Sequence, residues 1–439
     1  MTATPAAAPV PDMGRSRTLT LSALLGRPIT ARDGESLGRL SDVIVRLRGD
    51  DYSLVTGLVA TVGGRQVYVP MEQVESFDTE ELKLTSARID LRRFERRHGE
   101  VLLRADVLGH RLIDVESARL VRAADLQLAE RDGEQVLVGV DTRRRPSRVL
   151  GWLGLGGREP EPGVFRDSKQ FEPLIGHSGS ALLRRPFGRI RRLKPAQIAD
   201  LLEEASKEEE TEILGQVHAD PELEADVFEE LDEDKATRLF GERSDQEVAE
   251  VVSRMRADDA ADAIGELPQR RRQAVLDLLP PGQRTKVLTL MGFNPTSAGG
   301  LMGMDFITLP EDIRVDEVLE AVRLAKTLQP EALTSVHATS EDGRLAGVAR
   351  LVGLVQADSG ARLLDVCDTD PVRVGPDTDV VDVAVLMTDY NLITIPVVDE
   401  QCRMLGLITV DDVLEITLPG DWRRREAAEP PDHHRGDSP

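Results

Sequence analysis

The spacing of apolar residues changes twice along the 439-residue chain, and this succession limits the fold to a series of unlike domains. From about residue 18 to 145, short Val, Ile and Leu runs alternate with Gly and Asp turns, which is typical of small β-barrels. From 193 to about 293 the apolar residues follow a helical period, and from about 302 to 418 strands and helices alternate. The sequence therefore predicts a multidomain protein with a β part, an α part and an α/β part.

The β part repeats internally with a constant offset between two copies of one pattern. Self-similarity of this kind is the signature of tandem modules. The second copy has lost a turn glycine, since Gly34 becomes Ser117, so we expect its turns to differ. The aligned positions are Leu25-Gly26 with Leu108-Gly109, Leu37 with Leu120, Arg39 with Arg122, and Asp42 with Asp125.

The first copy contains the run DGESLGRLSDVIV from Asp33, followed by the strand ending VYVP at Pro70. These motifs resemble the PRC-barrel family, and the resemblance implies docking modules rather than catalysts. We therefore expect a disordered arm at 1–17, PRC-barrel-like domains at 18–97 and 98–145, and a linker at 146–192. The linker is Gly- and Pro-rich between two basic clusters, which could either be solvated or touch the acidic region that follows.

Short amphipathic segments recur between residues 193 and 296, each ended by a polar or Pro break. Asp and Pro at the starts of these segments fit the N-cap and first-turn positions of helices. The pattern predicts stacked short helices, similar to a small α-solenoid. The successive junctions begin at Leu231, Met255, Leu267 and Leu279.

The formal net charge of −23 restricts the classes of partner. Nucleic-acid phosphates and anionic lipids both require clustered Lys and Arg, so neither is expected as a partner. An acidic surface instead attracts cations or basic proteins, although it could also serve only to keep the protein in solution. The two cysteines, Cys367 and Cys402, share no metal-ligand spacing. With no signal peptide and no apolar run long enough to span a membrane, we expect a cytoplasmic protein that is not inserted in the membrane.

The last part of the chain carries the sharpest motif. The strand Ile395-Pro396-Val397-Val398 is followed by Gly406-Leu407-Ile408-Thr409 and then by Asp412, which resembles a CBS domain. The resemblance implies that Asp412 binds ribose hydroxyls and that Thr409 and the helix N-terminus meet phosphate. The alternative is that Thr409 and Asp412 only cap the helix. The nucleotide-binding candidates are Ile395, Pro396, Thr409 and Asp412.

An earlier stretch of the same α/β part looks like a first CBS repeat but lacks the ribose-binding carboxylate. Arg350 and Gly353 stand where Thr and Asp are expected. We therefore expect CBS repeats at 297–360 and 361–419, with any nucleotide at the second, and a disordered tail at 420–439.

The helical region, the junction SAGGLMGMDFITLPED from Ser297 and the CBS pair together resemble the cytoplasmic part of MgtE magnesium transporters. That resemblance implies an MgtE N-terminal-like domain at 193–296, Mg²⁺ bound between acidic faces of this domain and the CBS pair, and ATP or another adenine nucleotide in the pair. It departs from the family because no transmembrane stretch follows the CBS pair. We expect a homodimer formed through the CBS pairs, with a membrane transporter or other protein bound by the PRC-barrels.

Acidic residues far outnumber basic ones between residues 200 and 266. Mg²⁺ prefers one or two carboxylates plus water, and two acidic faces close such a site better than one. On the helical side three aspartates recur at a spacing of three to four residues, which places them on one helix face. The metal candidates are Asp258, Asp259 and Asp262 on the helical side and Asp411 on the CBS side.

The sequence thus favours a regulatory protein that senses Mg²⁺ or adenine nucleotide, with a link to magnesium homeostasis. A docking scaffold that binds no ligand is the alternative. An enzyme is the third and weakest hypothesis, because the sequence shows no nucleophile–base pairing and no Gly-rich phosphate loop.

Overall fold

The computed structural model describes residues 18–143, 165–174 and 188–418, apart from Asp50, Glu80 and His98. The predicted arm, the tail and most of the predicted linker lie outside these residues. The chain divides into two compact units, residues 1–235 and 236–439, and the boundary falls inside the helical region rather than at its start. None of the described helices is long and apolar enough to cross a membrane.

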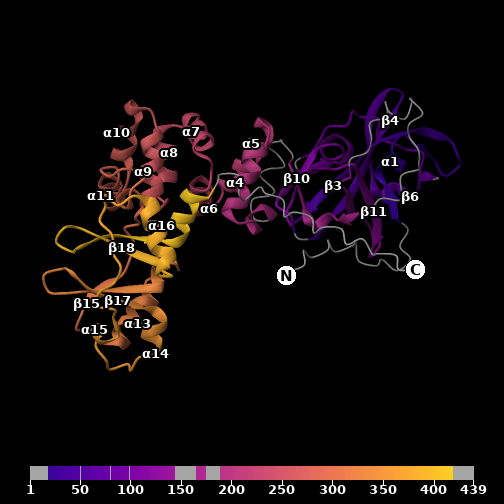
Figure 1. The fold of residues 1–439 in the computed structure, drawn as a ribbon. Coiled ribbons are helices and arrows are strands. Elements are labelled where there is room, and N and C mark those ends of the chain that lie inside the picture. The colour runs from indigo at the N-terminus through magenta and orange to yellow at the C-terminus, as the bar shows by residue number, and fades with distance from the viewer. Residues whose placement is uncertain are drawn as a thin grey trace, which may run out of the picture. The chain divides into compact units, whose positions relative to one another are not determined.

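Among the described residues of the first unit, eleven strands form one sheet (Figure 1). Its order is β1-β11-β12-β4-β3-β2-β7-β6, with β13 beside β12, β5 beside β4 and β8 beside β3, and a smaller sheet has the order β10-β9-β14. The strands are β1 (Thr18–Thr20), β2 (Pro28–Thr30), β3 (Ser36–Arg48), β4 (Asp51–Val62), β5 (Arg65–Pro70), β6 (Val74–Phe77), β7 (Leu82–Leu84), β8 (Glu100–Leu102), β9 (Arg111–Asp114), β10 (Arg119–Arg122), β11 (Asp125–Arg131), β12 (Glu134–Asp141), β13 (Arg166–Asp167) and β14 (Phe171–Pro173).

The two copies of the repeat complete each other by exchanging their first strands. β1 of the first copy pairs antiparallel with β11 of the second, and β8 of the second copy pairs antiparallel with β3 of the first. The longest strands, β3 and β4, are buried over four consecutive residues at their centres (42–45 and 57–60), and one apolar core contains residues of both copies. The strand-rich region predicted from the sequence is confirmed, and its two copies form one intertwined β module.

Two aspartates at equivalent positions hold this exchange in place. The carboxylate of Asp42 accepts hydrogen bonds from the backbone N–H groups of Arg104 (2.7 Å) and Ala105 (3.0 Å), which belong to the second copy. The carboxylate of Asp125 accepts from the N–H (3.1 Å) and the hydroxyl of Ser22, in the first copy. Both aspartates are buried, at 4% and 1% exposed. Each copy therefore supplies the acceptor for a helical turn of the other.

Part of the predicted linker belongs to this module. Within 146–192, the described strands β13 and β14 pair with β12 and β9. The guanidinium of Arg189 is buried and donates to the carbonyls of Phe171 and Gly49, both at 2.8 Å. These residues correct the expectation of a solvated linker, because their backbone groups are satisfied by the sheet.

Short helices follow, as the sequence predicted. Ser206 and Glu209 form a capping box at the start of α5, and Ser244 and Glu247 form one at the start of α8. In the second unit α8 packs against α10 and α9 against α11. The helices are α1 (Leu21–Leu24), α4 (Pro195–Glu204), α5 (Lys207–Val217), α6 (Pro221–Glu229), α7 (Glu233–Gly241), α8 (Asp245–Val252), α9 (Ala257–Glu266), α10 (Gln269–Leu278) and α11 (Pro281–Leu290).

Two related α/β repeats complete the second unit. The register pairs Ser335 with Arg350 in the first repeat and Thr394 with Thr409 in the second, so Arg350 stands at the position of Thr409. The repeats meet where the hydroxyls of Ser335 and Thr394 lie 2.8 Å apart. Their elements are α12 (Ala298–Leu301), β15 (Thr308–Pro310), α13 (Val315–Leu324), β16 (Ser335–Thr339), β17 (Leu345–Arg350), α14 (Leu351–Gln356), α15 (Leu363–Val366), α16 (Val380–Asp389), β18 (Thr394–Val398), β19 (Met404–Thr409) and α17 (Val410–Thr417).

The reciprocal aspartates predict crossed effects on amide exchange. In Asp42→Ala we expect faster hydrogen exchange at the amides of Arg104 and Ala105 in the other copy, together with a loss of about 1–3 kcal/mol of stability, because these N–H groups lose a buried charged acceptor. In Asp125→Ala we expect the same at Ser22. Asp90→Ala, at an exposed carboxylate of the same module, is the control and should change stability by less than about 0.5 kcal/mol. Faster exchange confined to the mutated copy would contradict the exchanged arrangement.

Candidate functional site

The strongest candidate site lies between the first turn of α9 and the first turn of α17. Arg256 is the N-cap residue of α9, and Asp258 and Asp259 follow in its first turn. Thr409 is the N-cap residue of α17, and its N–H (3.0 Å) and hydroxyl (2.6 Å) both donate to one oxygen of Asp412. This capping box fixes the Asp412 side chain against the end of β19.

The guanidinium of Arg256 joins the two helix starts. It donates to Asp259 at 2.6 Å and to the second oxygen of Asp412 at 2.8 Å. Asp412 is 6% exposed, so this ion pair is largely removed from water. Both oxygens of Asp412 thus have a donor, one from its own helix cap and one from the helical segment.

Asp258 lines the same cavity as Arg256 and Asp412 and is 8% exposed. Burial raises the pKa of the Asp258 carboxyl, the positive charge of Arg256 opposes the rise, and the negative charge of Asp412 adds to it. Three carboxylates, from Asp258, Asp259 and Asp412, therefore gather around one guanidinium, and a further cation would be favoured there.

A cavity of about 200 Å³ opens between these groups. Its walls come from the turn before α9, from α9 itself, from the segment after α12, from the segment before β16, from the end of β19 and from the first turn of α17. Polar lining residues are Arg254, Arg256, Asp258, Asp305, Thr327, Gln329, Thr409 and Asp412.

The structure brings together some of the predicted site residues and leaves others outside. Asp258 and Asp412 line the cavity with Thr409, and Asp259 is joined to them through Arg256. Asp262 and Asp411 are exposed and do not line it. Ile395 and Pro396 are buried in β18, where Pro396 accepts a hydrogen bond from Val374, and they do not line it either.

The sequence analysis missed Arg256, which makes the central contact. Its only local signal is a basic residue directly before an acidic helix start, in a region where acidic residues dominate. Its partner Asp412 is 156 residues away, so no local pattern could identify the pair.

The described residues contain no group of three or more His, Cys, Asp or Glu side chains arranged to hold a metal ion. The predicted set of four aspartates is therefore not assembled as a closed metal centre. What the cavity offers is two buried carboxylates with space beside them, and this suits Mg²⁺, which is bound by one or two carboxylates and keeps several waters.

Comparison with known proteins supports the domain types. Residues 17–96 match the PRC-barrel domain family, residues 193–296 the MgtE intracellular N domain family, and residues 363–418 the CBS domain family. The chain thus resembles the cytoplasmic part of MgtE transporters preceded by a PRC-barrel region, as the sequence predicted.

Individual proteins share parts of the chain. The magnesium transporter MgtE of Thermus thermophilus is 38% identical over 162 residues, which are 36% of this chain and 36% of the transporter. The chain therefore spans only about a third of that relative. A crystal structure of the cytosolic domain of the Mg²⁺ channel MgtE in complex with ATP is 29% identical in sequence and has a TM-score of 0.49. The match covers 54% of this chain and 94% of the chain in that crystal structure. A homoserine O-acetyltransferase of Methanococcoides burtonii is 28% identical over 120 residues, 27% of this chain and 23% of the enzyme.

The ion pair between Arg256 and Asp412 predicts a measurable coupling between the two helix starts. Arg256→Met should lower stability by roughly 1–3 kcal/mol, because a buried charge loses its partner. In an Asp412→Asn background the same change should cost clearly less. Arg254→Met, an exposed arginine lining the same cavity, is the control. A double-mutant cycle from thermal unfolding gives the coupling, and strictly additive losses would contradict it.

Proposed function

We propose that residues 193–418 form a regulatory sensor in which Mg²⁺ and an adenine nucleotide act on the contact between α9 and α17. The single observation that carries this proposal is the cavity where the buried carboxylates of Asp258 and Asp412 meet around Arg256. Two helices that are far apart in the sequence, α9 and α17, begin there, so a ligand bound at this point would change how they are held together.

Asp258 and Asp412 are the residues that would hold Mg²⁺. Bound Mg²⁺ would supply positive charge to a place where burial already disfavours the charged form of Asp258. The chain's own part is to fix one carboxylate on α9 and the other on α17, so that bringing them together depends on a cation. Arg256 supplies that charge in the structure, and Mg²⁺ would add to it or replace it at Asp412.

The nucleotide would use the start of α17. Each carboxylate oxygen has two acceptor sites, so Asp412 can accept a ribose hydroxyl in addition to its present donors. The N–H groups at the N-terminus of α17, with Arg254 and Arg256 nearby, favour phosphate. The cavity is smaller than the roughly 300–1,000 Å³ of typical small-molecule pockets, so binding a whole nucleotide requires α9 and α17 to move apart.

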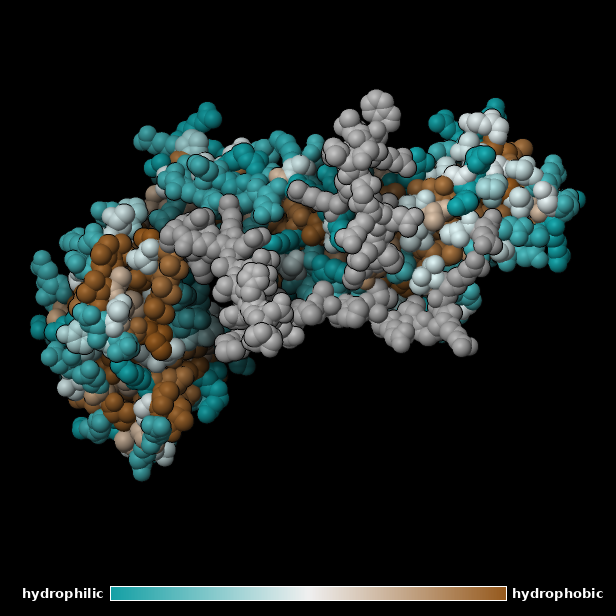
Figure 2. All heavy atoms as spheres, turned by 45° about the vertical axis from the view of Figure 1, so that its right-hand side comes forward, coloured by the Kyte–Doolittle hydropathy of each residue, from teal (hydrophilic) through white to brown (hydrophobic). Residues whose placement is uncertain are grey.

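We further propose that the CBS region pairs with a second copy of the chain. Large apolar side chains are exposed on its helices, among them Val352 at 67%, and Figure 2 shows brown surface gathered there. Monomeric proteins rarely expose apolar groups in such a cluster. The exposed residues are Leu324 on α13, Val352 and Val355 on α14, Val381 and Val385 on α16, Tyr390 and Ile393 in the segment after α16, and Leu414 and Ile416 on α17.

The similarity to part of a magnesium transporter supports a cytoplasmic role in magnesium homeostasis, with a membrane transporter or another protein as the partner of the β module. The matched families are the MgtE intracellular N domain, the CBS domain and the PRC-barrel domain, and we propose a regulatory rather than an enzymatic role for the chain. A scaffold that binds neither ligand is the competing hypothesis, and it predicts no response in either titration below.

Mg²⁺ should stabilise the protein more than a monovalent salt does. A ligand that binds only the native state adds about 2.7 kcal/mol at a hundredfold excess over its Kd, whereas screening depends on ionic strength alone. Melting curves in MgCl₂ and in KCl of equal ionic strength separate the two effects. Asp258→Asn should lose the excess response, and Asp262→Asn, an isosteric change at an exposed position of the same helix, should keep it. Equal shifts in the two salts would leave only the scaffold hypothesis.

ATP should bind through Asp412. Asp412→Ala should weaken binding by about ten- to a hundredfold, which corresponds to a hydrogen bond with a charged acceptor. Asp411→Ala, at the exposed neighbouring residue outside the cavity, should bind like the native protein. Calorimetric titration gives both affinities. Unchanged affinity in Asp412→Ala would place the nucleotide elsewhere or show that Asp412 serves only as a helix cap.

A further inference from the structure

A second and larger cavity, of about 500 Å³, lies inside the intertwined β module, far along the sequence from the cavity at α9 and α17. Its walls come from both copies of the repeat, since β3 belongs to the first copy and β8, β9 and β12 to the second. The apolar walls include Val45, Val101, Leu103, Leu112, Leu137 and Phe171.

These wall residues belong to the core of the module. Val45 and Leu103 are fully buried, and both belong to the same apolar cluster as Leu137 and Phe171. Protein interiors are close-packed, with few voids larger than a water molecule. A partly open space of this size, walled by core residues, falls instead in the range of small-molecule pockets, about 300–1,000 Å³, which are mostly apolar with a few placed polar groups.

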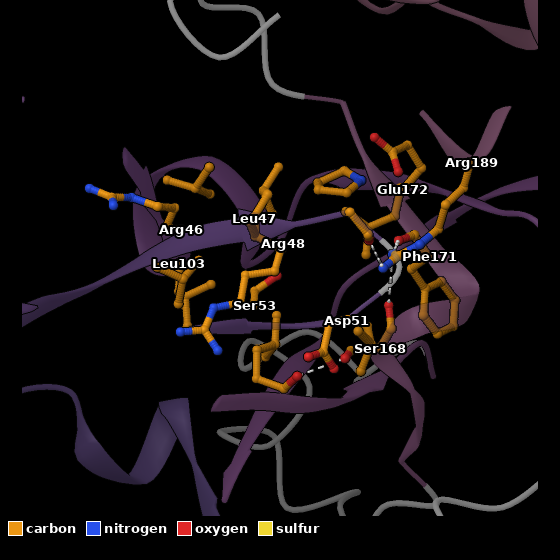
Figure 3. A pocket seen from close by; sticks show the side chains of 18 of the residues that line it. Arg46, Leu47, Arg48, Asp51, Ser53, Leu103, Ser168, Phe171, Glu172 and Arg189 are labelled. Carbon is orange, nitrogen blue, oxygen red and sulfur yellow. Dashed lines mark hydrogen bonds between the residues drawn. The ribbon is translucent and has the colours of Figure 1, made fainter. Parts of the chain in front are cut away.

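The placed polar group is the guanidinium of Arg189, which is 9% exposed. It donates to the carbonyls of Phe171 and Gly49 at 2.8 Å and of Ser168 at 3.5 Å, and it forms no ion pair with any described carboxylate. Figure 3 shows this guanidinium reaching toward the middle of the pocket, with the carboxyl group of Glu172 at the edge. A buried cation held only by carbonyls favours an anion beside it.

The other charges of the pocket lie toward solvent or already have partners. Arg46 and Arg48 are exposed, and Arg48 binds Glu134 at 2.8 Å, while Asp51 binds Lys169 at 3.4 Å. Glu172 is a buried carboxylate of the lining, 5% exposed, and it also has a partner. The positive charge inside the pocket is therefore that of Arg189.

We propose that this cavity binds an amphiphile with an apolar body and a carboxylate head, such as a medium-chain fatty acid, whose head group pairs with Arg189. The apolar body takes the space between the two copies of the repeat. The β module is then a ligand-binding domain in addition to a docking domain, and this site is independent of the Mg²⁺ and nucleotide site.

Titration of the full chain with dodecanoate below its micellar concentration tests the proposal. Dodecanol and dodecylamine, which have the same alkyl chain but a neutral or a positively charged head group, are the comparison ligands. Dodecanoate should bind about tenfold or more tightly than dodecylamine, since only the carboxylate gains a charge-assisted hydrogen bond. Arg189→Gln should remove this preference while dodecanol binding persists. Equal affinities for the three probes in the native protein would overturn the role of Arg189.

Filling the cavity tests the location of the site. Leu137→Trp should abolish dodecanoate binding, and Leu91→Trp, at a 61% exposed position of the same module, should leave it unchanged. Val101→Phe fills another wall and serves if Leu137→Trp fails to fold, as judged by circular dichroism. Native-like binding in a folded cavity-filling variant, or no binding by the native protein, would overturn the proposal.

Discussion

The carboxylate of Asp412 is held from two sides, and the proposed regulatory behaviour depends on this division. One oxygen accepts from the N–H and hydroxyl of Thr409, which closes the first turn of α17, and the other accepts from Arg256 at the start of α9. The first contact is local and stabilises the helix. The second joins segments that are 156 residues apart. Removing the second contact therefore leaves the first in place, so α17 can stay folded while its connection to α9 changes.

An ion pair between a buried carboxylate and a partly buried arginine is better suited to switching than to stability. The cost of removing two charges from water offsets much of their attraction, whereas leaving one charge without its partner is strongly unfavourable. At this site the charges are also unequal in number, because the carboxylates of Asp258 and Asp259 share the single guanidinium of Arg256 with Asp412. A divalent cation would bind the same carboxylates without fixing a long, flexible side chain, because its other ligands are water molecules. Less side-chain freedom would therefore be lost than when arginine supplies the charge.

The sequence predicted the kinds of domain but not how their parts connect. The repeat, with its offset of 83 residues from Leu25 to Leu108, was visible in the sequence. The same repeated pattern is compatible with strands that pair within one copy and with strands that pair between the two copies. Hence the exchange of β1 and β8, and the crossed contacts of Asp42 and Asp125, could not be foreseen. Thr409 and Asp412 were identified because the CBS-like motif that contains them is a local pattern of fixed spacing. Arg256 was not, because its role exists only in the tertiary structure.

The same limit explains the cavity in the β module. Several of its apolar wall residues, such as Val45 and Leu137, lie in the buried runs of β3 and β12, so their sequence pattern predicts ordinary core residues. The space lies where strands from the two copies share one core. Arg189 belongs to a segment whose sequence predicted a basic linker. Its guanidinium can be buried because the carbonyls of Gly49 and Phe171 accept hydrogen bonds from it. An intertwined duplication can therefore create an interior that neither copy has alone, and a charged group at its wall gives that interior chemical selectivity.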